Sequence, residues 1–131
     1  MKEYTAKHAT AGLTAKLPEI EWFPNQFPKG YESTVSIPEF TSICPKTGLP
    51  DFGTITISYM PDKRVVELKS LKMYILGYRN LGIFNENAVS RILKDFVKAI
   101  RPKWASVTGD FNPRGGIKNL VEATYGRKPK K

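Results

Sequence analysis

Alternation of apolar and polar side chains predicts a β-strand over residues 53–60. Isoleucine or tyrosine stands at 55, 57 and 59, and threonine or serine at 54, 56 and 58, so one face of the strand would be buried. Residues 31–37 also alternate and are rich in β-branched side chains, which favours another strand. Pro38 is expected to end that strand or to place it on a sheet edge, because proline has no backbone N–H to donate.

In the middle of the chain, apolar side chains recur with a period close to that of an α-helix. Residues 68–80 have apolar or aromatic side chains at positions 68, 71, 75 and 78, which predicts a helix. A second helix is predicted after Asn85, which precedes Glu86 and is expected to cap it, and Pro102 is expected to end it. Its apolar stripe consists of Val89, Ile92, Leu93, Phe96, Val97 and Ile100.

Two further strands are predicted near the end of the chain, over residues 103–111 and 117–124, joined by a turn at 112–116. The order β-β-α-α-β-β predicts an α+β fold with both helices on one face of an antiparallel sheet. We expect one catalytic domain over residues 31–126, preceded by an irregular aromatic arm (1–30) and followed by a basic tail (127–131). The sheet would have open edges, and such edges are often paired between subunits, so an oligomer is expected.

Composition narrows the possible functions. The 131 residues include a single cysteine and no apolar run near the roughly 20 residues of a membrane span, which predicts a cytoplasmic protein with no membrane partner. The net charge of +9 suggests an anionic partner such as nucleic acid, a phosphorylated cofactor or an acidic protein. No nucleic-acid-binding motif accompanies the charge. His8 is the only histidine, so we expect neither a metal site nor a Cys-His protease.

Cys44 lies in a polar segment rich in proline and glycine, and Asp51 follows seven residues later. A loop of this composition is able to fold back and bring the carboxyl group close to the sulfur. Two interpretations stay open at this point. Cys44 is either a nucleophile or a small buried side chain near the end of a strand.

Three other groups of polar residues are candidates for binding. Lys69 and Lys72 would share one helical face and suit phosphate groups, although they also fit an ordinary solvated face. Glu86 would either interact favourably with the helix dipole or accept two parallel N–H bonds from a guanine-like edge. Arg114 would contact phosphate or simply belong to a turn.

Four segments together resemble the NADPH-dependent 7-cyano-7-deazaguanine reductases, the nitrile reductases of queuosine biosynthesis. The segments are residues 44–52, 67–74, 84–86 and 113–116, in the family's order and spacing. The short chain resembles the single-module form. This resemblance implies a tunnelling fold whose modules assemble into an oligomeric β-barrel. A decamer of two pentamers is implied for the short type, with active sites between subunits.

The resemblance also implies the role of each site residue. Cys44 would add to the nitrile of 7-cyano-7-deazaguanine as a covalent thioimide, and Asp51 would be the proton donor. NADPH would be the cofactor, and neither a metal nor direct nucleic-acid binding would be needed. The positions matching the substrate site are Val66, Glu67, Leu68, Asn85 and Glu86. The positions matching the NADPH site are Lys69, Ser70, Lys72 and Tyr74, with Arg79 and Arg114 as further phosphate contacts.

Two positions depart from the family pattern. Asn85 stands where histidine is common, and an amide cannot take up a proton near neutral pH. Leu68 stands where many relatives have a smaller polar residue. Two alternative functions remain. One is a related amidinotransferase that acts on the nitrile-bearing base in tRNA and lacks the NADPH-associated segment. The other is a non-catalytic purine- or RNA-binding module, which would leave the pairing of Cys44 with Asp51 unexplained.

Overall fold

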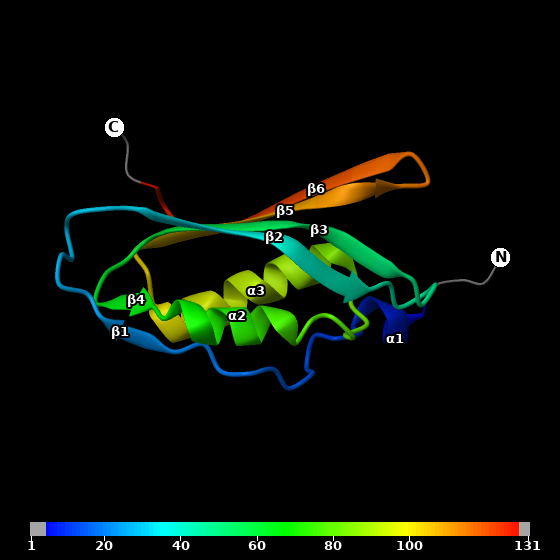
Figure 1. The fold of residues 1–131 in the computed structure, drawn as a ribbon, viewed down its shortest axis with the longest axis horizontal. Coiled ribbons are helices and arrows are strands. Elements are labelled where there is room, and N and C mark those ends of the chain that lie inside the picture. Colours follow the sequence, from blue (N-terminus) through cyan, green and yellow to red (C-terminus); the bar gives the residue numbers. More distant parts are fainter. Residues whose placement is uncertain (1–4, 129–131) are drawn as a thin grey trace.

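A four-stranded antiparallel sheet with helices on one face forms the body of the protein in the computed structural model, which describes residues 5–128 (Figure 1). The strands lie in the order β2-β3-β5-β6, and α3 packs on β5 and β6 while α2 lies against β2. The predicted α+β class and the predicted β-β-α-α-β-β order of the main elements are confirmed. The elements are α1 (Ala6–Ala9), β1 (Trp22–Pro24), β2 (Ser33–Ile43), β3 (Pro50–Met60), β4 (Arg64–Val66), α2 (Leu68–Leu76), α3 (Asn85–Ile100), β5 (Trp104–Arg114) and β6 (Ile117–Gly126).

The core lies between the sheet and the two helices. Ile55, Ile57 and Tyr59 of β3 are fully buried, as their alternation predicted. The apolar stripe of α3 meets them, and the ring of Phe96 lies 4.9 Å from that of Tyr59 in an edge-to-face contact. Burial of these two periodic faces explains why the hydrophobic pattern predicted the layers correctly.

The strands extend beyond their predicted ends. Pro38 does not end β2, because a shift in the pairing with β3 between Ile37 and Phe40 takes up the irregularity and the strand continues to Ile43. A proline is tolerated there because β2 lies at the edge of the sheet. A similar shift lets β5 run to Arg114, so the predicted turn at 112–116 was too long. The actual turn is Gly115 and Gly116, with φ of 61° and 78°.

Both predicted helices need correction at one end. Helix α2 ends at Leu76, four residues before its predicted end, and Gly77 follows as its C-cap. Asn85 does not cap α3 but is its first helical residue, and Phe84 occupies the N-cap position. The helix ends at Ile100, just before Pro102, in agreement with the prediction.

Residues 5–30 pack along their own chain, on the side of the helices that faces away from the sheet (Figure 1). Strand β1 pairs with β4 in a small second sheet that the sequence pattern did not predict. Ile20 belongs to the buried core, and Arg91 of α3 donates to the backbone carbonyls of Gly12 and Ala15. Of the predicted basic tail, residues 129–131 lie outside the described residues. No helix within residues 5–128 has the length and apolar character needed to cross a membrane.

Candidate active site

Cys44 and Asp51 lie at the same end of the β2–β3 hairpin. Cys44 directly follows β2, and Asp51 is the second residue of β3, opposite Ser42. The intervening loop is closed by two backbone hydrogen bonds of 2.9 Å, from Cys44 N–H to the Leu49 carbonyl and from Gly48 N–H to the Cys44 carbonyl. The structure therefore brings the thiol and the carboxyl group together, as the composition of the loop suggested, and the charge of Asp51 acts on Cys44.

The environment of Cys44 favours its ionised form. Partial burial raises the pKa of the thiol, but hydrogen bonds from the Thr47 hydroxyl and from the backbone N–H groups of Thr47 and Lys46 outweigh it. The nearby charge of Asp51 raises the pKa again by a smaller amount. The net result is a pKa below the usual value for cysteine. A lowered pKa increases the fraction of thiolate, which is the nucleophilic form of cysteine.

Arg114 reaches this hairpin from the end of β5. Its Nη1 donates to Asp51 Oδ1 at 2.5 Å, and its Nη2 donates to Thr47 Oγ1 at 2.9 Å. The resemblance suggested Arg114 as a phosphate contact, but the guanidinium here bridges the acid and the loop that holds the thiol. The bridge depends on the pairing of β5 with β3, which the sequence pattern did not reveal.

The segment before α3 completes this end of the molecule. The Ile43 N–H donates to the Leu81 carbonyl and the Ile83 N–H to the Ile43 carbonyl, both at 2.9 Å, so this segment runs alongside the end of β2. It places Asn85 and Glu86, at the start of α3, near the hairpin. Glu86 is exposed and accepts a hydrogen bond of 3.2 Å from Asn119.

Two buried polar atoms at this end have no hydrogen-bond partner among the described residues. They are Ser42 Oγ and Asn85 Oδ1. Buried polar atoms are usually hydrogen-bonded, so unpaired atoms of this kind are expected where a site awaits a ligand or water. Ser42 was not among the predicted site residues, and no signal in its local sequence distinguishes it from any other serine in a strand.

Glu67 lies elsewhere, at the N-terminus of α2. Its carboxylate accepts hydrogen bonds from the N–H groups of Lys69 (2.9 Å) and Ser70 (2.8 Å) and so caps the helix. These bonds lower the pKa of Glu67. The backbone of Glu67 is held by the residue just before β1, because its N–H donates to the Glu21 carbonyl at 3.0 Å.

The four predicted NADPH-binding side chains of α2 divide into two pairs. Lys69 and Lys72 are exposed. Ser70 and Tyr74 are buried, and burial raises the pKa of the Tyr74 phenol. The Ser70 hydroxyl donates to the Glu67 carbonyl and accepts from Glu21 N–H, both at 2.8 Å.

Tyr74 anchors the other end of this helix. Its hydroxyl donates to Asp95 Oδ2 at 2.6 Å, which ties α2 to α3. In this structure, Ser70 and Tyr74 therefore fix α2 in place, while the two lysines project from it. Tyr74 also lines a cleft of about 440 Å³ that lies beneath residues 17–22 and holds none of the other predicted site residues.

A mainly apolar groove of about 360 Å³ runs between the edge strand β2 and α2. Val35, Ile37, Leu68 and Leu71 contribute apolar surface, Lys72 contributes a positive charge, and Glu39 contributes a negative one. Apolar surface beside an ammonium group fits a cofactor that combines aromatic rings with phosphates. Arg79, in the turn after α2, is exposed. Among residues 5–128, no three His, Cys, Asp or Glu side chains are grouped as a metal site would require.

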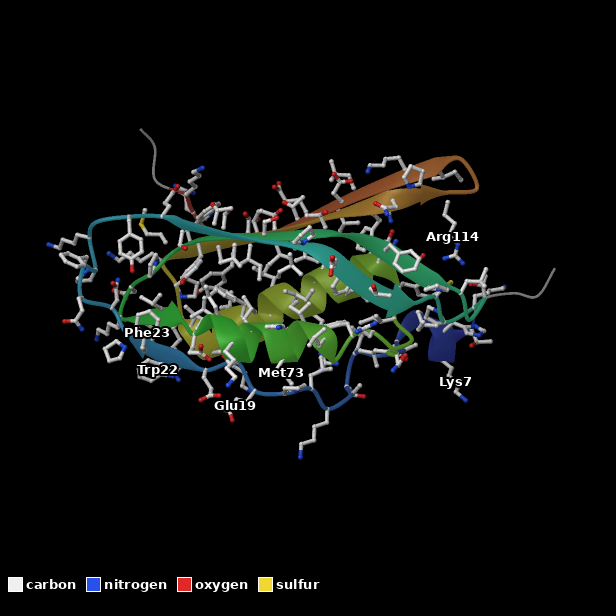
Figure 2. The ribbon with its side chains drawn as sticks, in the orientation of Figure 1. Lys7, Glu19, Trp22, Phe23, Met73 and Arg114 are labelled. Carbon is white, nitrogen blue, oxygen red and sulfur yellow. The ribbon has the colours of Figure 1, made fainter. Side chains whose placement is uncertain are left out.

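The end of β2, which Cys44 follows, and the start of α2, where Glu67 lies, are at opposite ends of the molecule (Figure 1). The Cys44 loop lies at the end where Figure 2 labels Arg114. Val66, which precedes Glu67, pairs with Trp22, labelled at the opposite end of Figure 2. A single chain therefore does not bring Glu67 close to Cys44.

Comparison with known proteins identifies the family. The family model described as QueF-like protein matches residues 50–130, which is more than half of the chain. The chain belongs to the QueF-like family. This result confirms the resemblance inferred from the four sequence segments.

Curated relatives of this QueF-like chain are similar over most of their length. A protein from Elusimicrobium minutum is 57% identical over 125 residues, covering 95% of both chains. A protein from Chloroherpeton thalassium is 54% identical over 107 residues, covering 81% of this chain and 92% of its own. Both relatives are named NADPH-dependent 7-cyano-7-deazaguanine reductase.

A solved structure shares the fold of the QueF-like chain. It is the apo form of an archaeosine synthase QueF-Like, with a TM-score of 0.71 and 22% sequence identity. The match covers 77% of this chain and 99% of that one. The predicted tunnelling fold is confirmed at the level of the single chain.

Proposed function

We propose that this QueF-like chain reduces the nitrile of 7-cyano-7-deazaguanine to a primary amine with NADPH, as a step of queuosine biosynthesis. The observation that carries the proposal is the hairpin that places Cys44, with its lowered pKa, beside Asp51. The relatives that are 54–57% identical to the chain and bear the name of this reductase support the choice of substrate and cofactor.

A nitrile carbon accepts hydride poorly, and the addition of Cys44 turns it into a better acceptor. Its thiolate attacks the nitrile carbon, a carbon–sulfur bond forms, one carbon–nitrogen π bond breaks, and the nitrogen takes up a proton. The product of this step is a thioimide on Cys44. We propose that Asp51, whose charge acts on Cys44, relays that proton to the nitrogen.

The whole reduction of the nitrile to the amine requires two hydrides and two protons. The first proton is the one taken up when the thioimide forms. NADPH, when bound, supplies hydride. The bond between Cys44 and carbon breaks between the two reductions, and the sulfur leaves as a thiolate. A sulfur with a lowered pKa is a better leaving group as well as a more abundant nucleophile at neutral pH.

Carboxylates and ammonium groups divide the binding tasks. Glu67 and Glu86 suit the N–H donors of the deazaguanine ring, because a carboxylate only accepts hydrogen bonds. Val66, Leu68 and Asn85 are the other proposed substrate contacts. Lys69 and Lys72 suit the phosphates of NADPH, with Arg79 as a further contact. Ser70 and Tyr74 support them by fixing α2.

We infer that a second copy of the chain completes the site. The separation of Glu67 from Cys44 within one chain supports this inference, and so do the edge strands β2 and β6 of the four-stranded sheet. Unpaired edge strands offer hydrogen bonds to a neighbouring copy. An assembly of two pentamers stays a prediction.

The direct test mixes the protein with 7-cyano-7-deazaguanine and follows NADPH absorbance. The proposal predicts oxidation of two NADPH for each nitrile, and none with Cys44→Ala. Absence of NADPH oxidation by the wild-type chain would defeat the reductase assignment. Formation of a nitrile adduct without NADPH oxidation would instead favour the amidinotransferase alternative.

A further inference from the structure

The hydroxyl proton of Thr47 has one acceptor among the hydrogen-bond partners that the structure shows. Its Oγ1 accepts a bond of 2.9 Å from Arg114 Nη2 and a bond of 3.2 Å from the Leu49 N–H. A guanidinium and an amide N–H are donors only, so both lone pairs of the hydroxyl are used. The Thr47 hydroxyl is also hydrogen-bonded to Cys44. In that bond the threonine is therefore the donor and the sulfur the acceptor.

We propose that Thr47, oriented by Arg114, is the positioning residue that holds Cys44 as a thiolate. This inference deepens the proposed function and rests on it in taking Cys44 as the nucleophile. The backbone N–H groups of Lys46 and Thr47 add two more donors to the same sulfur. Hydrogen bonds to a charged acceptor are stronger than those to a neutral one, so three donors favour the ionised form.

Arg114 also balances the negative charge of Asp51. A thiolate beside the Asp51 carboxylate would bring two negative charges together. The bond from Arg114 Nη1 to Asp51 Oδ1 supplies the opposing positive charge. One guanidinium thus offsets the acid with one nitrogen and orients Thr47 with the other.

Asp51 is the charged group whose field acts on Cys44. Lys7 of α1 lies at the same end of the molecule as Arg114 (Figure 2). Lys46 belongs to the Cys44 loop itself, and residues 81–84, which run alongside Ile43, contain no charged side chain. At the start of α3, Glu86 is hydrogen-bonded to Asn119. The ionisation of Cys44 is therefore expected to follow changes at Thr47, Asp51 and Arg114.

Alkylation of Cys44 tests the proposal without the nitrile or NADPH. Cys44 is the only cysteine, so the rate of iodoacetamide modification, followed by intact mass across pH, reports this thiol alone. The midpoint is the pH at which the alkylation rate is half its maximum. We expect Thr47→Val to move this midpoint upward by about one pH unit and to slow alkylation at neutral pH roughly tenfold. Thr47→Ser keeps the hydroxyl and is expected to restore the wild-type midpoint.

Charge variants test the second part of the proposal. Arg114→Gln is expected to raise the midpoint, and Asp51→Asn to lower it. The double variant Arg114→Gln/Asp51→Asn is expected to fall below Arg114→Gln alone, because the carboxylate left unpaired by the single change is gone. Circular dichroism of each variant confirms that it is folded. Thr47→Ala serves in place of Thr47→Val if the valine variant fails to fold.

Two outcomes decide the matter. A wild-type midpoint in the folded Thr47→Val or Thr47→Ala variant would overturn the proposal, whatever the reductase assay gives. A raised midpoint that Thr47→Ser reverses supports it, even if the wild-type chain fails to oxidise NADPH with the nitrile. In that last case the proposed function fails while the thiolate-holding role stands.

Discussion

Among the predicted site residues, Asn85 is the one whose change is most informative. Its Oδ1 is buried without a partner in the described chain, and the resemblance places a histidine at this position. An imidazole would add a group that titrates near pH 6.5, whereas an amide does not titrate. The two side chains therefore predict different dependence of turnover on pH.

We expect Asn85→His to add a limb near neutral pH to the profile of kcat against pH. The control is Asn87→His, which places the same imidazole two residues further along α3. The measurement is steady-state NADPH oxidation over a pH series. Superimposable profiles for the wild type and Asn85→His would show that position 85 takes no part in proton transfer.

The sequence predicted the candidate nucleophile better than it predicted its surroundings. The seven-residue spacing of Cys44 and Asp51 across a proline- and glycine-containing loop is local, so the sequence carried it. The contact of Arg114 with Asp51 joins residues 63 positions apart and depends on how β5 pairs with β3. Side-chain pairing at that range follows from the register of the sheet, which no local pattern encodes.

Two features limit prediction of the elements. Strong periodicity predicted α3 and the core face of β3, because burial on one side imposes a period. The ends of β2 and β5 were missed because pairing shifts near Pro38 and Pro113 allow the strands to continue. Strands of three residues, such as β1 and β4, are too short to show a period at all.

The contact between α3 and β5 depends on Gly109. A Cβ at this position would lie 2.6 Å from Val89 Cγ2 and 2.7 Å from Phe111 Cε2. Gly109→Ala is therefore expected to lower the free energy of unfolding by about 1–3 kcal/mol through overpacking. Gly82→Ala is the matched control, because no atom lies within 4 Å of its Cβ position. Urea unfolding measures both, and equal stability of the two variants would contradict the packing described.

The N-cap of α2 predicts a pH-dependent contribution to stability. The pKa of Glu67 is lowered by the N–H groups of Lys69 and Ser70. A lowered carboxyl pKa stabilises the fold above the unfolded-state value, and this stabilisation is lost as the pH falls through the folded-state value. Glu67→Gln is expected to melt below the wild type at about pH 7, and the difference is expected to shrink as the pH falls below the unfolded-state value of about 4.3. A difference in melting temperature that persists unchanged at low pH would contradict the cap.

At the scale of the whole molecule, the main finding is that two predicted site residues, Cys44 and Glu67, lie at opposite ends. Open sheet edges were expected from the order of strands, and β2 and β6 are those edges. The positions of Glu67 and Cys44 at opposite ends were not foreseen, because the two residues are only 23 positions apart in the sequence.

Subunit mixing tests whether the site is shared between copies. Cys44→Ala and Glu67→Gln are each expected to be inactive alone, since each lacks one half of the site. Coexpression of the two, with different tags to isolate mixed assemblies, is expected to restore part of the activity, because some interfaces combine two intact halves. Mixed assemblies that stay inactive would show that both halves must come from the same chain.

The most direct test of the central claim is the intact mass of the protein after incubation with 7-cyano-7-deazaguanine in the absence of NADPH. The account predicts a mass gain of one nitrile molecule per chain, located at Cys44, absent from Cys44→Ala and removed when NADPH is added. An unmodified chain that nevertheless oxidises NADPH with the nitrile would contradict the claim that Cys44 is the nucleophile.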